Sequence, residues 1–125
     1  MPETRQLNAK GEMDYDYSND ILFFKAKNRE YSKSLEFNNI VIDIDKENFI
    51  VGIQIFDASK FLRISKIALR SVPKWQFRAN IIDNKIEIRL VFQVVYRNKR
   101  IEMNPIIMTE TEGNLPNSRL IAVEA

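Results

Sequence analysis

Apolar and polar residues alternate along most of this chain with a period of two, the pattern of strands that bury one face. The clearest stretch covers residues 40–59, IVIDIDKENFIVGIQIFDAS. The isoleucines at alternate positions from 40 to 44 share one face, and the alternation resumes at Phe49 after the charged segment 45–48. This stretch predicts a β-hairpin around which the other elements are arranged.

A second hairpin is predicted earlier in the chain. Alternation begins at Met13, a turn follows at residues 18–20, and the apolar run ILFFKA occupies residues 21–26. Residues 27–38 are polar and predict a connecting loop. Residues 1–12 show no periodicity and predict a loose N-terminal arm.

The C-terminal part predicts further strands. Residues 75–81 alternate, turn at Asp83-Asn84, and continue as a long strand over residues 86–96. A turn at Asn98-Lys99 leads to a strand over residues 101–107, in which Pro105 indicates a sheet edge because proline has no backbone N–H to donate. A last short strand is predicted at residues 119–123.

Between these two sets of strands the period changes to 3.6 residues. Asp57 is expected to cap one amphipathic helix that Pro73 ends. Ile64 and Ile67 fall beside the apolar side of this helix rather than on it. We therefore expect an α+β fold, in which antiparallel β-hairpins carry one amphipathic helix packed on the sheet.

The expected domain organisation is simple. Residues 13–125 form one domain, in which residues 13–72 supply the hairpins and the helix and residues 73–125 supply a C-terminal antiparallel β extension. No linker rich in Gly, Ser or Pro divides them.

The composition excludes several kinds of catalytic chemistry. The chain contains no His and no Cys, so Ser-His and Cys-His nucleophiles and imidazole or thiolate metal sites are impossible. Asp14, Asp16, Ser18 and Asp20 match part of a calcium-loop spacing, but Lys25 occupies the position of the bidentate Glu. We expect a protein that is not an enzyme, with no cofactor and no catalytic or metal site. A hydrolase based on carboxylates is a less favoured alternative.

Charge is distributed unevenly. Residues 1–60 carry eight Lys and Arg against eleven Asp and Glu, a net −3, whereas residues 61–125 carry eleven against six, a net +5. The N-terminus lacks the apolar core of a signal peptide, and no apolar run is long enough to span a bilayer. We expect a cytoplasmic protein that does not bind a membrane.

Several short motifs carry a family resemblance. Tyr15-Asp16 is followed by NDIL at residues 19–22, IDID at 42–45, IVGI at 50–53 and IFDAS at 55–59. In this order they resemble the prokaryotic domain-of-unknown-function family number 2283, over about residues 13–64. The resemblance implies small β-hairpin domains that end in a helix, without an established activity. Some members are similar to antitoxin partners encoded beside small RNase-like toxins.

Two surfaces are candidates for binding. Lys60, Arg63, Lys66 and Arg70 share one side of the predicted helix and suit an anionic partner. Ile64 and Ile67 on the helix, with Val91 and Val95 on the second face of the long strand, are apolar positions that a monomer leaves uncovered.

We therefore predict an interaction module, a homo-oligomer or an antitoxin-like partner of another protein. The alternative is a nucleic-acid-binding module that uses the basic helix face, and we rank it second because the acidic first half would repel a polyanion.

Overall fold

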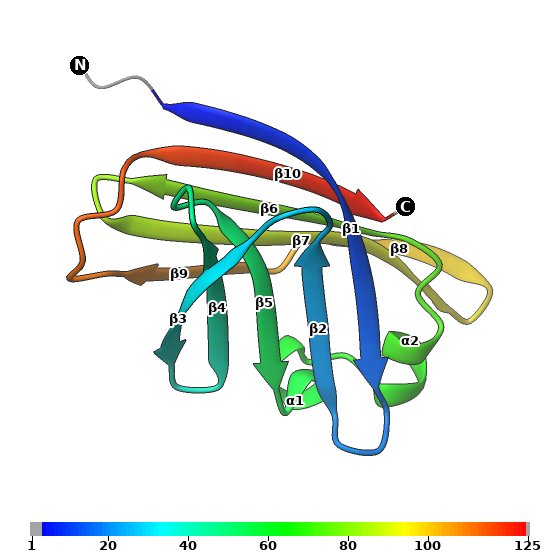
Figure 1. Ribbon diagram of the computed structural model, residues 1–125. Coiled ribbons are helices and arrows are strands. Elements are labelled where there is room, and N and C mark those ends of the chain that lie inside the picture. Colours follow the sequence, from blue (N-terminus) through cyan, green and yellow to red (C-terminus); the bar gives the residue numbers. More distant parts are fainter. Residues whose placement is uncertain (1–3, 125) are drawn as a thin grey trace.

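In the computed structural model, residues 4–124 are described and form one mixed sheet of ten strands with two short helices (Figure 1). The strands are β1 (Arg5–Asp16), β2 (Ile21–Ala26), β3 (Tyr31–Phe37), β4 (Ile40–Asp45), β5 (Ile50–Phe56), β6 (Trp75–Ile82), β7 (Lys85–Tyr96), β8 (Lys99–Met103), β9 (Ile106–Glu110) and β10 (Ser118–Glu124). The helices are α1 (Ala58–Leu62) and α2 (Lys66–Arg70).

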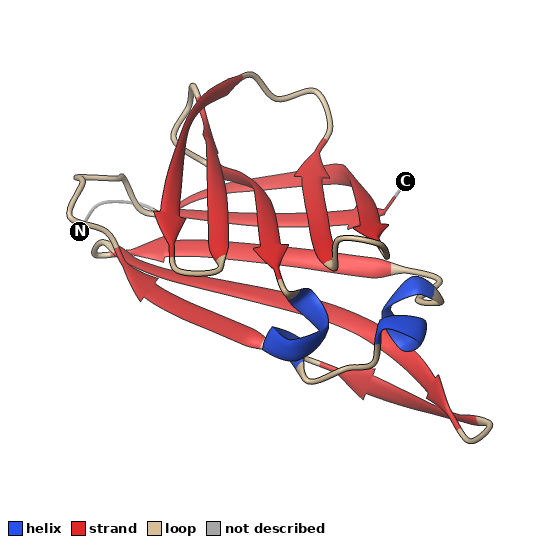
Figure 2. Ribbon diagram, turned by 90° about the horizontal axis from the view of Figure 1, so that it is seen from below, coloured by secondary structure: helices blue, strands red, loops and turns tan. Residues whose placement is uncertain are grey.

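The predicted α+β arrangement with one amphipathic helix packed on the sheet is wrong, because the chain is mostly β. Each helix has only five residues, little more than one turn, and cannot cover a sheet face. Both helices lie at the same end of the molecule (Figure 2). No helix in residues 4–124 is long and apolar enough to cross a membrane.

The sheet folds over and covers its own apolar face. This is possible because the long strand β1 pairs with strands from both ends of the chain. The strand order is β3-β4-β5-β2-β1-β10-β6-β7-β8, with β9 also paired to β7. Residues 5–11 of β1 pair with β10 in parallel, and residues 11–16 pair with β2. We call β3, β4, β5 and β2 the N-terminal half-sheet, and β10, β6, β7, β8 and β9 the C-terminal half-sheet. Their strands cross at a steep angle in Figure 1, as in orthogonal β packing.

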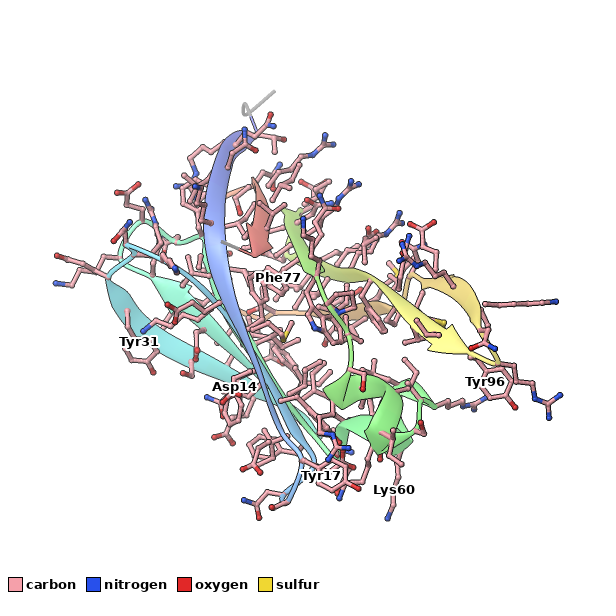
Figure 3. The ribbon with its side chains drawn as sticks, turned by 90° about the vertical axis from the view of Figure 1, so that its right-hand side faces the viewer. Asp14, Tyr17, Tyr31, Lys60, Phe77 and Tyr96 are labelled. Atoms are coloured by element: carbon pink, nitrogen blue, oxygen red, sulfur yellow. The ribbon has the colours of Figure 1, made fainter. Side chains whose placement is uncertain are left out.

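Gly11 lies where β1 passes from one half-sheet to the other. A Cβ atom at this position would collide with the ring of Phe24. Phe24 stacks on Phe77 of the other half-sheet, with ring centroids 4.7 Å apart, and Figure 3 shows Phe77 in the middle of the molecule. The absent side chain therefore lets β1 bend tightly over this aromatic pair.

The core consists of the residues that alternate inward from both half-sheets. For residues 40–44, 53–55 and 75–90 this alternation was predicted from the sequence and is confirmed. They include Leu22, Phe24, Ile42, Ile44, Ile53 and Ile55 on one side, and Phe77, Ala79, Ile81, Ile86, Ile88, Leu90, Leu120 and Ala122 on the other.

Two segments predicted to lack regular structure are strands. Residues 5–12 of the supposed loose arm form most of β1, because β10 supplies a parallel partner from the far end of the chain. Residues 1–3 of that arm lie outside the described residues. Residues 31–37 of the supposed loop form β3, an exposed edge strand paired with β4.

The predicted single helix breaks at residues 63–65. Arg63 takes a left-handed conformation (φ 58°) and ends α1, while the Ser65 hydroxyl accepts a hydrogen bond from the Ala68 N–H at 3.1 Å and begins α2. The break changes the direction of the chain so that Ile64 is buried.

Pro105 lies at the edge of the C-terminal half-sheet, as the sequence predicted. β8 and β9 pair with successive parts of β7 in one continuous register, interrupted only around Pro105. The predicted third strand is thus two short strands, and the turn before it is at Arg97-Asn98 rather than at Asn98-Lys99.

Candidate interaction surface

A groove of about 830 Å³ crosses the side of the C-terminal half-sheet that faces away from the core, which we call the outer face. It lies where the segment after α2 enters β6 and where β7 and β8 extend as a hairpin. Its lining residues are Ser71, Pro73, Lys74, Trp75, Gln76, Val91, Phe92, Gln93, Val95, Arg100, Glu102 and Val123.

The alternation of β7 places Val91 and Val95 in this groove. Their neighbours in the strand, Phe92 and Val94, are buried in the core, so Val91 and Val95 point outward. Val95 is 62% exposed, and Val123 of β10 is 42% exposed in the same groove. Both valines of β7 were predicted as interface residues, and the structure brings them together.

The β7–β8 hairpin also exposes apolar side chains on the face opposite the groove, where Ile101 pairs with the core-facing Val94. Tyr96 and Ile101 are 60% and 42% exposed. Figure 3 shows Tyr96 at the tip, far from Phe77 in the core. Lys74 and Arg100 add positive charge to the lining of the groove, and Glu102 adds one carboxylate. The surface therefore combines exposed aliphatic side chains with a mainly basic border.

The two isoleucines predicted for the same interface do not join it. Ile64 is buried in the core, so its prediction is wrong. Ile67 is 62% exposed, but it belongs to α2 and does not line the groove.

The predicted basic face is divided between the two helices. Lys60 and Arg63 belong to α1 and its C-terminal end, and Lys60 points into solvent in Figure 3. In α2, the Lys66 ammonium lies 4.6 Å and the Arg70 guanidinium 4.7 Å from the ring centroid of Tyr17. These cation–π contacts hold the Lys66 and Arg70 side chains against the β1–β2 turn. The four side chains are therefore not equally available to an anionic partner.

The acidic β1–β2 turn also stabilises the start of α1. Asp20 accepts hydrogen bonds from the Tyr15 hydroxyl at 2.6 Å, the Ser59 N–H at 3.0 Å and the Ser59 hydroxyl at 2.7 Å. Partial burial opposes its ionisation, but these hydrogen bonds outweigh it and lower the pKa of Asp20. Burial and the bond to Asp20 raise the pKa of Tyr15.

Asp57, the predicted cap, makes no side-chain capping bond. The true cap, Asp20, is remote in sequence, and the residue pattern gave no signal for it.

A second carboxylate organises the β4–β5 turn. Asp45 is 1% exposed and accepts hydrogen bonds from the N–H groups of Glu47 and Phe49, each at 2.9 Å. Arg29 binds it at 2.7 Å. The position of Asp45 in a charged turn suggested local hydrogen bonding. The burial of its carboxylate depends on Arg29, which is distant in sequence.

Residues 4–124 contain no group of three or more Asp and Glu side chains placed to hold a metal ion. In the calcium-like spacing, Asp16 instead accepts hydrogen bonds from Asn19, and these lower the pKa of Asp16. Asp20 and Asp45, the two carboxylates with the most hydrogen bonds described above, serve contacts within the fold.

Comparisons with known proteins place these features in a family. The profile of the family described as a protein of unknown function, DUF2283, matches residues 12–59, which comprise the β1–β2 hairpin, β3, β4, β5 and the start of α1. The chain is 30% identical over 114 residues to a Methanosarcina mazei protein named "Putative hypoxanthine phosphoribosyltransferase", covering 91% of this chain and 93% of that protein.

It is also 29% identical over 99 residues to an uncharacterized protein of Methanocaldococcus jannaschii, covering 78% of this chain and 85% of that protein. No solved structure matches significantly. The family profile confirms the resemblance that the motifs of the first half predicted, with residues 12–59 matching the DUF2283 family of proteins of unknown function, and the chain belongs to the same family as the Methanosarcina protein.

Proposed function

We propose that this protein is a binding module that assembles with another polypeptide through the outer face of its C-terminal half-sheet. The observation that carries the proposal is the groove of about 830 Å³, in which Val91, Val95 and Val123 are brought together from two strands. Keeping such side chains in water forgoes on the order of 1.5–3 kcal/mol each relative to full burial. A partner that covers the groove would recover part of this free energy.

The composition of the surface suits a protein partner. Interface cores are enriched in aromatic residues and Arg, and they are surrounded by polar residues. Here Val91, Val95 and Val123 supply the aliphatic lining, while Lys74 and Arg100 provide charge at its border. The partner is a second copy of the chain or, as the family resemblance suggests, a different protein to which this one acts as an antitoxin-like partner.

Binding is favoured over catalysis by the chemistry of the titratable groups. The chain has no His or Cys. The groups whose pKa is shifted, Tyr15, Asp16, Asp20 and Arg29, make hydrogen bonds that hold turns and neighbouring strands together. The name of the Methanosarcina relative refers to phosphoribosyl transfer, but the three glycines of this chain lie apart at 11, 52 and 113 and form no Gly-rich phosphate loop.

The nucleic-acid alternative that relied on the basic helix face receives less support. Lys66 and Arg70 lie over Tyr17, which leaves only part of that face free.

The proposal is tested by sedimentation equilibrium at micromolar concentrations, with the protein alone and with the purified product of a neighbouring gene. Val95→Glu is expected to abolish association, because it introduces a charge into the apolar groove. Ile67→Glu is the matched control, since Ile67 is equally exposed, at 62%, but lies outside the groove. Association that survives Val95→Glu, or that Ile67→Glu abolishes as effectively, would contradict the proposal.

A further inference from the structure

Three arginines from three neighbouring strands share the outer face beside the groove. Arg119 belongs to β10, Arg78 to β6 and Arg89 to β7. Arg78 and Arg89 are direct partners across the β6–β7 pair. Arg119 pairs with Asn80, two residues from Arg78 on the same face. The register therefore places the three arginines next to one another on one face of the sheet.

This arrangement is unfavourable without a counter-ion, because like charges directly opposite each other in a sheet repel. No carboxylate lies directly beside the Arg78–Arg89 pair on the neighbouring strands. The residue paired with Arg78 on β10 is Ile121, and the residue paired with Arg89 on β9 is Ile106. Glu87 precedes Arg89 by two residues in β7, and its carboxylate is 3.9 Å from the Arg89 guanidinium.

The hydrogen bonds of these arginines are incomplete within the described part of the chain. Arg78 Nε donates to Gln76 Oε1 at 3.1 Å. Arg89 Nε is buried and has no hydrogen-bond partner among the described residues. A buried donor without an acceptor costs free energy, and a turn of the Arg89 side chain toward a bound anion would remove that cost.

We infer that Arg78, Arg89 and Arg119 form a binding site for the terminal phosphate of a small ligand, a phosphomonoester or a pyrophosphate. Three guanidinium groups and the Glu87 carboxylate leave a net charge of +2. A phosphomonoester carries about −1.5 to −2 at neutral pH, so the charges match. Its three terminal oxygens accept hydrogen bonds from several directions, whereas one Arg fork satisfies a carboxylate.

The surroundings favour a small ligand over a nucleic-acid strand. Single-stranded nucleic acids bind where aromatic rings stack with their bases. The outer-face neighbours of the three arginines are aliphatic or polar, namely Ile121, Ile106, Val91, Asn80 and Met108. These side chains can contact the stems of the arginines and the body of a small ligand.

The test uses the full chain and pyrophosphate, titrated by calorimetry and by thermal unfolding, with sodium chloride at equal ionic strength as the reference. Each of Arg78→Gln, Arg89→Gln and Arg119→Gln is expected to weaken pyrophosphate binding on the order of tenfold or more, because each removes charge-assisted hydrogen bonds. Lys33→Gln on the distant strand β3 is the control with the same change in charge, and it should bind as the wild type does.

A second measurement separates a binding role from a structural one. Without ligand, Arg89→Gln should unfold at the same temperature as the wild type or at a higher one, since it relieves the repulsion with Arg78. With pyrophosphate, the wild type and Lys33→Gln should gain more thermal stability than each of the three arginine variants.

Three results would overturn the inference: no stabilisation of the wild type by millimolar pyrophosphate, equal weakening by Lys33→Gln, or binding of mixed-sequence oligonucleotides that is more than tenfold tighter than that of pyrophosphate. The site does not depend on the proposed interface. Val95→Glu should still bind pyrophosphate, and the failure of either proposal is visible on its own.

Discussion

The hydrogen bonds of Asp20 join the first hairpin to the start of α1, and replacing this carboxylate tests that connection. Asp20→Asn preserves the shape of the side chain, and Asn tolerates the left-handed backbone of position 20 (φ 57°). The amide retains one acceptor oxygen in place of the carboxylate that binds Tyr15 and Ser59.

The expected loss of unfolding free energy is roughly 2–3 kcal/mol at neutral pH. A hydrogen bond to a charged group contributes about 1.5–3 kcal/mol, and a helix cap about 1 kcal/mol, while partial exposure reduces the sum. With a urea dependence of about 1.5 kcal/mol/M, the unfolding midpoint should fall by roughly 1.5 M. Asp14→Asn is the control, because Asp14 is an exposed carboxylate of β1 in the same hairpin.

The pH dependence gives a second, independent test. The pKa of Asp20 in the folded protein is lowered below its ordinary 3.8. Its contribution to stability is therefore complete above pH 3.8 and disappears as the pH falls through the folded value. The difference between wild type and Asp20→Asn should be constant near neutrality and shrink under acid. If Asp20→Asn costs no more than Asp14→Asn, or if the difference does not change with pH, the carboxylate does not hold the hairpin to α1.

Two further substitutions test the fold in urea titrations. Gly11→Ala should cost about 1–3 kcal/mol because its methyl group would press against Phe24, whereas Gly113→Ala, which meets only an ordinary contact at 3.5 Å, should be nearly neutral; equal effects would contradict the tight bend of β1. Asp45→Ala should cost roughly 3 kcal/mol, because it removes the acceptor of two turn N–H groups and leaves Arg29 without its buried partner. A loss below about 1 kcal/mol would show that the turn does not depend on Asp45.

The strands that sequence alone predicted are those with a strong local pattern. Residues 40–56 and 75–96 alternate because one face is buried, and the turns at their centres contain Asp and Asn in left-handed conformations. By contrast, β3 is exposed over its first four residues, and only Leu35 and Phe37 near its end pack against the core, so its sequence shows no strong pattern. Residues 5–12 become a strand through pairing with β10, and no local window of sequence contains that partner.

The predicted helix failed for a related reason. The 3.6-residue pattern extends through residues 58–72, but the chain gains more by burying Ile64 than by continuing the helix. No glycine marks the left-handed turn at Arg63 in the sequence, because this chain has Asn, Asp and Arg at its left-handed positions.

The candidate surface was only partly accessible to sequence reasoning. Val91 and Val95 were identified because the second face of a strand becomes apolar, which is a local signal. Val123 and the Arg78–Arg89–Arg119 cluster depend on the register between β10, β6 and β7, which becomes known only when the strands are paired.

The central claim is that the outer face is the contact surface, and the absence of natural cysteine allows a direct measurement of it. Val95→Cys and Ile67→Cys each introduce a single thiol at a position whose native side chain is 62% exposed. Their alkylation rates are compared at low concentration and in the assembled state, whether with a second copy or with a partner protein. We predict that assembly slows alkylation at position 95 by at least about tenfold, as expected for a buried interface position, and leaves position 67 unchanged. Equal rates at position 95 in both states, or protection of position 67 alone, would contradict the account.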